Sequence, residues 1–288
     1  MKYKFMHEHR EEFSIEKMAS VLRVSSSGFY SCGKRPPSSR EKENLGLAQK
    51  IEEIYLEGRQ LYGSPRIHGR LIKMGIKCSR KRVARLMKKQ GLAAKMRNKW
   101  KRTTKPNKRE AAKNLVQQKF TVSIPNSVWV SDITYVYTRE GWLYVAVILD
   151  LFSRKIVGLC MRRKMESSLV EQALQQALQH RNPPRGLIHH SDRGSQYTSE
   201  SFARMTEKHG VFLSMSSTGN CYDNAVAESF FHTLKTEHIF HMRFWSREEA
   251  KRSIFEYVEI FYNRRRAHSF LGYLSPEEFE QNQSRLAI

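Results

Sequence analysis

Residues 127–162, SVWVSDITYVYTREGWLYVAVILDLFSRKIVGLCMR, decide the fold of this chain. Runs rich in Val, Ile, Tyr and Trp predict strands at 127–138, 142–150 and 154–162. The REG sequence at 139–141 is typical of a hairpin turn. Three strands joined by short turns predict an antiparallel meander at one edge of a sheet.

Downstream of the meander, helical and strand patterns alternate. Helices are expected at 167–181, 199–209 and 246–264, and in a segment around Glu228. The short apolar run at 186–192 is typical of a buried parallel strand, and a further short strand is expected at 211–216. The whole pattern predicts an α/β mixed sheet with flanking helices.

Three aspartates stand out in this half of the chain. Asp132 lies inside a strand, where Asp is disfavoured. Asp192 ends the buried strand, and ligands of open α/β sheets bind at strand ends. Asp150 also ends a strand, but the LFSR sequence after it predicts that it caps a turn.

Glu228 lies on the polar face of its helix, together with Asn224, Lys235 and His232. One interpretation is a solvated surface acid. The other is a metal ligand, because the helix can pack on the sheet beside Asp132 and Asp192. Three converging acids repel one another unless a cation lies between them, and oxygen ligands suit Mg²⁺ or Mn²⁺. Two such ions can hold the attacking and leaving oxygens of a phosphodiester.

The net charge is +23, and it is concentrated in the front of the chain. Residues 1–119 hold 31 Lys and Arg against 10 Asp and Glu, and no acid occurs from 58 to 109. Such an excess predicts a polyanionic partner, with nucleic acid favoured over a membrane surface. The two halves fit one function, because a basic front part would bind the DNA whose phosphodiesters the back part acts on.

Two helical pairs are expected in the basic front. Residues 14–33 fit a helix-turn-helix with Ser14 as its first cap, although an ordinary helical hairpin fits equally well. After a helix at 41–58, residues 62–75 and 79–91 form a second pair, in which Ser64 and Ser79 are the expected N-caps.

The helix at 79–91 has an inner apolar stripe and an otherwise basic surface. This is typical of a helix that enters the DNA major groove, and the alternative is a solvated basic helix. Its expected DNA-binding residues are Arg80, Lys81, Arg82, Arg85, Lys88 and Lys89. The basic stretch at 95–109 predicts an arm that follows phosphates, and Trp100 within it fits either a base-stacking residue or an anchor.

The remaining features exclude several protein classes. No apolar run is long enough to span a bilayer, and the N-terminus is not a signal peptide. The four cysteines form no CxxC pair, so a cytoplasmic protein with reduced thiols is expected. A zinc site built from His189, His190 and Cys221 is disfavoured, because adjacent strand residues point to opposite faces.

The motifs around the three acids resemble those of DDE transposases and retroviral-type integrases, which share a ribonuclease H-like fold. They are WVSDITYV, HHSDRGSQYTS and STGNCYDNAVAESFFHTLK, with 35 residues between Asp192 and Glu228. SRKIVG, YNRRRAHSFLGYLSP, YGSPRIHGRL and SRKRVARLMKKQGL also match. Together these motifs resemble the second-reading-frame transposases of bacterial insertion sequences.

The resemblance implies five segments. These are a helix-turn-helix segment with its linker (1–40), a second DNA-binding domain (41–94), a basic linker (95–119), a ribonuclease H-like catalytic core (120–240) and a helical extension (241–288).

The resemblance also implies metal-dependent cleavage and strand transfer of insertion-sequence ends. Asp132, Asp192 and Glu228 would hold the metal pair, Lys235 would contact terminal phosphates, and Asn224 would orient substrate or cap its helix. The implied partners are double-stranded DNA from terminal repeats and target, further copies of the chain, and the first-frame product as a frameshift fusion. A DNA-binding regulator, or a nuclease of the same fold that does not join strands, is the alternative.

Overall fold

The computed structural model of the chain describes residues 2–34, 36, 38–95, 112–118, 120–216 and 221–286. Its contacts divide the chain into two compact units, residues 1–51 and 52–288. The division falls inside helix α4 (Ser39–Glu57).

The first unit contains the helices α1 (Lys2–Glu8), α2 (Ile15–Leu22) and α3 (Ser26–Lys34). The Ser14 hydroxyl accepts a hydrogen bond from the Lys17 amide at 3.4 Å, which confirms the expected cap of α2. Met6 of α1 is fully buried against Met18 and Ala19 of α2. Helix α1 was not expected from the sequence, and it supplies the apolar cover that the other two helices need.

The second unit begins with the end of α4, followed by α5 (Ser64–Lys73) and α6 (Arg80–Lys89). Ser79 caps α6 as expected, since its hydroxyl accepts from the Arg82 amide at 3.2 Å. The expected cap at Ser64 is wrong, because Gly63 is the N-cap and Ser64 is already helical. Pro65 still lies in the first turn, where its missing N–H costs nothing.

The sheet of the second unit has five strands in the order β3-β2-β1-β4-β5. The strands are β1 (Val128–Thr138), β2 (Gly141–Asp150), β3 (Ile156–Arg162), β4 (Ile188–Ser191) and β5 (Phe212–Met215). The first three form an antiparallel meander, and β4 lies parallel to both β1 and β5. The mixed sheet expected from the sequence is therefore confirmed.

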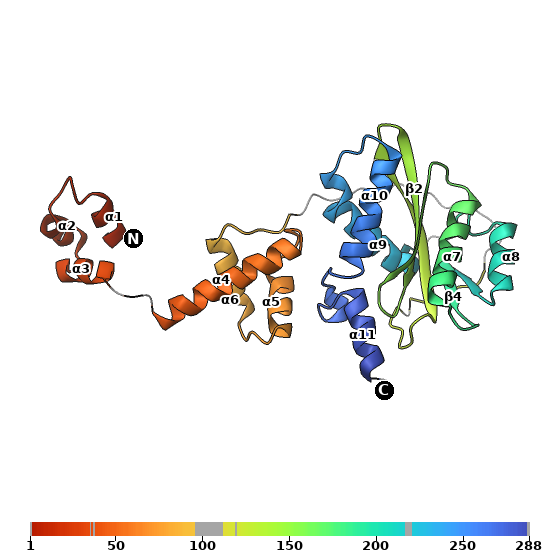
Figure 1. The fold of residues 1–288 in the computed structure, drawn as a ribbon, viewed down its shortest axis with the longest axis horizontal. Coiled ribbons are helices and arrows are strands. Elements are labelled where there is room, and N and C mark those ends of the chain that lie inside the picture. Colours follow the sequence, from red (N-terminus) through yellow and green to blue (C-terminus); the bar gives the residue numbers. More distant parts are fainter. Residues whose placement is uncertain are drawn as a thin grey trace. The chain divides into compact units, whose positions relative to one another are not determined.

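Helices cover both faces of this sheet, with α7 (Ser167–Arg181) and α8 (Glu200–Lys208) on one side (Figure 1). A core of buried side chains from β1, β2, β3, β5 and these two helices includes Trp129, Ile148 and Leu174. Gly158 of β3 lets α7 approach closely, because a Cβ there would collide with the Ala173 carbonyl oxygen. On the other face lie α9 (Ala225–Glu237) and α10 (Arg247–Glu256) (Figure 1).

The chain after α9 adds irregular helix to that second face. Helix α10 continues into a π-helical turn, Tyr257–Tyr262, and the chain ends with α11 (Pro276–Leu286). Short 3₁₀ turns occur at Cys221–Asn224, Ile239–His241 and Ser269–Leu271. In the part of the chain that the structure describes, no helix is both long and apolar enough to cross a membrane.

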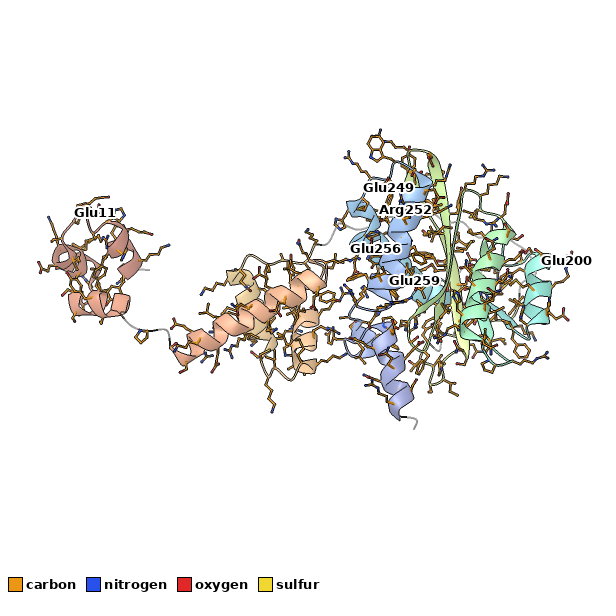
Figure 2. The ribbon with its side chains drawn as sticks, in the orientation of Figure 1. Glu11, Glu200, Glu249, Arg252, Glu256 and Glu259 are labelled. Carbon is orange, nitrogen blue, oxygen red and sulfur yellow. The ribbon has the colours of Figure 1, made fainter. Side chains whose placement is uncertain are left out.

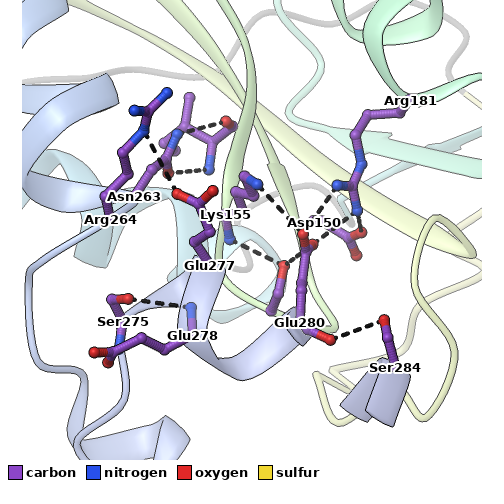
Figure 3. A network of polar contacts seen from close by, with 12 residues as sticks. Asp150, Lys155, Arg181, Asn263, Arg264, Ser275, Glu277, Glu278, Glu280 and Ser284 are labelled. Carbon is purple, nitrogen blue, oxygen red and sulfur yellow. Dashed lines mark hydrogen bonds and ion pairs between the residues drawn. The ribbon is translucent and has the colours of Figure 1, made fainter. Parts of the chain in front are cut away.

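Asp150 caps the turn after β2, as expected, and also joins a polar network with α11 (Figure 3). Its carboxylate accepts from the Phe152 amide at 3.0 Å and from the Asn126 amide at 2.9 Å. Arg181 of α7 lies 3.4 Å from Asp150 and 2.7 Å from Glu280 of α11. The network fixes the turn between β2 and β3 to the C-terminal helix.

A second network joins α5 to the C-terminal end of α9. Glu237, the last residue of α9, accepts two hydrogen bonds from Arg266, both 2.7 Å long, and one from Arg66 of α5 at 3.1 Å. The Tyr257 hydroxyl donates a fourth bond at 3.0 Å. Tyr62 adds a neighbouring contact, because its hydroxyl donates to the Arg265 carbonyl and accepts from the Ala267 amide. The helix pair α5–α6 is thereby attached to the part of this unit that contains the sheet and α9.

Candidate active site

Asp132 lies in β1, the central strand of the sheet. Strand β4 pairs with β1 only through Val128, Trp129 and Val130, so Asp132 comes just after the point where this pairing ends. Burial, together with the negative charge of Asp192, raises the pKa of Asp132 to about 8. A hydrogen bond from the Ile133 amide, 2.8 Å long, opposes the shift.

Asp192 follows β4 directly, at the carboxyl end of this strand. Because β4 and β1 are parallel, their carboxyl ends lie at the same edge of the sheet. This brings Asp192 beside Asp132. The Asp192 carboxylate accepts from the Gly194 amide at 3.0 Å. Its side chain reaches solvent at the mouth of the site, yet the surrounding protein raises its pKa by desolvation.

Glu228 lies in the first turn of α9, on the exposed face of this helix. The opposite face, which includes Ala227, Phe230 and Leu234, is buried against the sheet, as the sequence pattern predicts. The charge of Glu228 also raises the pKa of Asp132, so α9 brings this acid within electrostatic reach of β1.

Lys235 lies two helical turns after Glu228 and is half-buried. Its ammonium lies 5.3 Å from the centre of the Tyr135 ring, and its positive charge lowers the pKa of Asp132. Burial in turn lowers the pKa of Lys235 itself, while Asp132 opposes that shift.

The four side chains therefore form one electrostatic cluster centred on Asp132. Across the described ranges, however, no three or more His, Cys, Asp or Glu side chains converge closely enough to hold a metal ion. The donor set itself is suited to a hard divalent cation, because it consists of carboxylates alone. A cation there would also relieve the repulsion that raises the pKa of Asp132.

Asn224 positions α9 rather than capping it. It is the residue before α9, but its side chain makes no capping hydrogen bond, so the capping interpretation is wrong. Its Nδ2 instead donates to the Ser131 carbonyl of β1 at 3.1 Å. The 3₁₀ turn that precedes α9 directs the side chain to the strand. The start of α9 is thus tied to the residue next to Asp132.

The two adjacent histidines of β4 point to opposite faces, as expected. His189 is fully buried against Tyr197 and Phe202, and burial lowers its pKa to about 3. The His190 ring lies 2.8 Å from the Ser214 hydroxyl on the other side. The side chain of Cys221 lies outside the described residues. Cys78 and Cys160 are both free thiols.

Tyr197 is a residue of the site that the sequence analysis missed. It is fully buried, and its hydroxyl lies 2.6 Å from that of Ser131. Burial raises its pKa, and so do the charges of Asp132 and Asp192. The neutral ring supports the floor of the acidic cluster, and only its place in the DRGSQYTS sequence after β4 could have indicated this position.

Three family models match the chain in succession. An HTH-like domain matches residues 41–100, and an integrase core domain matches residues 122–221. A second integrase core model matches residues 228–284.

Curated relatives match along almost the entire chain. The transposase InsF of insertion sequence IS3A from Escherichia coli K12 is 42% identical over 97% of this chain and 98% of its own length. This chain belongs to the InsF-type transposases of insertion sequences. A 31 kDa protein of insertion element IS600 from Shigella sonnei is 44% identical, over 94% of this chain and 100% of its own length.

Solved structures that align with this chain come from retroviral integrases. A simian T-cell lymphotropic virus intasome chain aligns over 77% of this chain and 72% of its own length, with a TM-score of 0.46 and 13% identity. The catalytic core of HTLV-2 integrase with magnesium aligns over 52% and 94%, with a TM-score of 0.41 and 16% identity.

Membership of this transposase family establishes the class of function. The protein is a polynucleotidyl transferase of DNA transposition, with an integrase core and an HTH-like region that bind DNA. Neither the regulator nor the simple nuclease receives support from these relatives.

The basic residues expected on α6 lie in the HTH-like match. Arg80, Lys81, Arg85, Lys88 and Lys89 are exposed, and Arg82 is half-buried. Val83, Leu86 and Met87 are buried, as the inner stripe predicts. Most of the basic stretch at 95–109, including Trp100, lies outside the described residues.

Proposed function

We propose that Asp132, Asp192 and Glu228 are the catalytic acids of this transposase and together bind two divalent cations, Mg²⁺ or Mn²⁺. The observation that carries the proposal is the raised pKa of Asp132, to which both other acids contribute. Three acids in one electrostatic cluster, from β1, from the position directly after β4 and from α9, favour a bound cation over a purely structural role.

Bound divalent cations would supply Lewis-acid stabilisation of phosphate oxygens and a more acidic water. The three carboxylates orient this chemistry at one phosphodiester. Lys235 presents a cation to the adjacent DNA phosphate, and Asn224 keeps α9 in register with β1. After the first cut at an element end, the freed 3′-hydroxyl occupies the same site and attacks a second phosphodiester, without a covalent protein–DNA bond.

The proposed substrate is double-stranded DNA of the element's terminal repeats and of the target. Joining two ends in one event favours at least a dimer on the DNA. The active form is proposed to include the first-frame product as a frameshift fusion. The segments 1–40, 41–94, 95–119, 120–240 and 241–288 are proposed as the working divisions of the chain.

Asp132→Asn tests the metal site without depending on activity alone. Mg²⁺ should raise the melting temperature of the wild-type protein, because a ligand that binds only the folded state stabilises it. Asp132→Asn should lose most of that increase, together with Mg²⁺-dependent nicking of element-end DNA. Differential scanning fluorimetry with and without Mg²⁺ measures the first effect. An unchanged Mg²⁺ response would contradict the proposed ligand set.

Replacing Arg80, Arg82 and Arg85 of α6 with Ala should weaken duplex DNA binding by the full-length chain. If each arginine neutralises one phosphate, the slope of log affinity against log salt should fall by about 3. The control replaces Arg163, Arg204 and Lys208, which are exposed on the catalytic core, and so changes the net charge equally. Fluorescence anisotropy at several salt concentrations measures both. Equal losses in the two triple variants would sink the α6 assignment.

A further inference from the structure

An open groove with a volume of about 510 Å³ lies beside the acidic cluster, between the β1–β2 hairpin and the segment after α9. It is lined by the following residues of β1, the hairpin, α9 and the segment 239–244: Tyr135, Val136, Tyr137, Arg139, Trp142, Lys235, Ile239, Phe240, Met242, Arg243 and Phe244. None of these described lining residues is acidic.

Three aromatic rings in this groove are exposed and hold one another in place. Tyr135, Tyr137 and Trp142 are 42%, 65% and 46% exposed. The Trp142 ring packs edge-to-face against both tyrosines, with centroid distances of 5.1 and 5.3 Å. Tyr137 and Trp142 are direct cross-strand partners, so the hairpin register fixes the cluster. Rings that are already ordered lose little entropy when a planar ligand stacks on them.

Cations accompany these rings. Lys235 lies over the Tyr135 ring, and Arg139 stacks on Trp245 with 3.5 Å between the guanidinium carbon and the ring centre. Arg243 lines the same groove. Exposed aromatic faces with basic side chains and without acids are the combination that binds single-stranded nucleic acid.

Lys235 makes the groove continuous with the acidic cluster. Asp132 and Tyr135 differ by an odd number of residues along β1, so their side chains leave opposite faces of the strand. Lys235 nevertheless links the two residues. Its ammonium contacts the Tyr135 ring and also interacts with the Asp132 charge. A DNA backbone that passes Lys235 can therefore have one phosphate at the acids and the next nucleotides in the groove.

We propose that this groove binds unpaired nucleotides of the strand whose phosphodiester lies at the acids, with bases stacked on Tyr137 and Trp142 and phosphates near Lys235 and Arg139. Paired bases in a duplex do not present their faces to such rings, so the occupant is single-stranded DNA. The identity of the strand rests on the proposed function above, whereas the binding of unpaired bases does not.

Photo-crosslinking with a 12-nucleotide oligo-dT that contains 5-iodo-deoxyuridine tests the groove in the full-length chain. The experiment is carried out in EDTA, so that it reports binding without catalysis. Mass spectrometry should find cross-links on Tyr137 or Trp142. Trp142→Ala should reduce cross-linking at the hairpin about tenfold, since stacking on one aromatic ring is worth roughly a factor of 5 to 150 per base. Trp142→Phe keeps a ring and should retain most of it.

Phe212→Ala is the matched control, because Phe212 is an exposed aromatic residue, 61% accessible, on β5 outside the groove. It should leave the hairpin cross-links unchanged. Cross-links confined to residues outside the groove would overturn the proposal. So would a Trp142→Ala protein that cross-links normally but loses self-association, because the groove would then be a protein interface.

Repeating the cross-linking with Asp132→Asn separates this proposal from the proposed function. Hairpin cross-links that persist in this variant, alongside full catalytic activity, would support the groove while refuting the catalytic acids. Loss of activity with no hairpin cross-link in either protein would refute the groove and leave the acids in place.

Discussion

Glu228→Gln should reduce Mg²⁺-dependent cleavage and joining of element-end DNA by roughly 10³-fold or more, while the protein stays folded. Gln keeps the shape of the side chain and still offers one neutral oxygen, so metal affinity should fall without vanishing. Both reactions should fall together, because they share one site. Activity is measured with the fused first-frame form if the chain alone is inactive.

Stability should not follow activity in this variant. Glu228 lies on an exposed helix face, and its charge adds to the repulsion around Asp132. Removing that charge should leave the metal-free melting temperature unchanged or slightly higher. DNA binding through the basic front should also persist.

Glu200→Gln is the matched control for Glu228→Gln. Glu200 lies in the first turn of α8, just as Glu228 lies in the first turn of α9, and its side chain is 82% exposed (Figure 2). Both substitutions remove one negative charge near a helix N-terminus, so general electrostatic effects cancel. A fully active Glu228→Gln protein, or an equal loss in both variants, would refute the assignment of Glu228.

Glu237→Gln should destabilise the protein by about 3–5 kcal/mol, because it leaves a buried positive charge without its partner. The Arg266 side chain is only 4% exposed. Glu237 binds it through two hydrogen bonds and also forms an ion pair with Arg66. Chemical denaturation followed by fluorescence measures the free energy of unfolding.

Glu256→Gln provides the comparison for this buried pair. Glu256 of α10 also pairs with an arginine, Arg59 in the turn between α4 and α5, at 2.7 Å, but its side chain is 57% exposed (Figure 2). Exposed pairs contribute about 0–1 kcal/mol, so this variant should be nearly as stable as the wild type. Equal effects at Glu237 and Glu256 would show that burial does not govern the energy here.

The pH dependence of Glu237 follows from the same contacts. Burial opposes ionisation, but hydrogen bonds and charges from Arg266 and Arg66 lower the pKa to about 2, below the ordinary 4.5. The ionised carboxylate therefore contributes stability above pH 4.5, and the contribution is lost as the pH falls toward 2. Between these values, unfolding free energy should depend less on pH in Glu237→Gln than in the wild type.

Much of the fold could be predicted from local patterns. The helix at 167–181 was placed correctly to the residue, since apolar periodicity and Asn182 with two prolines define both of its ends. The mixed sheet followed from an antiparallel meander and one apolar strand typical of a buried parallel neighbour. In these segments, short-range signals agree with the tertiary structure.

Other features depend on tertiary contacts that local patterns do not encode. Helix α1 forms around Met6, whose burial requires α2. Asn224 is of a residue type that commonly caps helices, but it lies in a 3₁₀ turn and its amide donates to Ser131 instead. The sequence predicts three acids for the site, whereas the buried Tyr197 is evident only from the packing of the loop after β4 on β1.

Helix α9 carries Glu228 in its first turn and Glu237 at its last residue. Nine residues of α-helix separate the two by about 13 Å, and a helix of this length behaves as a stiff rod. At one end of the helix, Asn224 donates a hydrogen bond to β1. At the other end, Arg66 of α5 donates a hydrogen bond to Glu237. Because α9 is a continuous helix held at both ends, a displacement of α5 would move Glu237 and, through the helix, the end that carries Glu228.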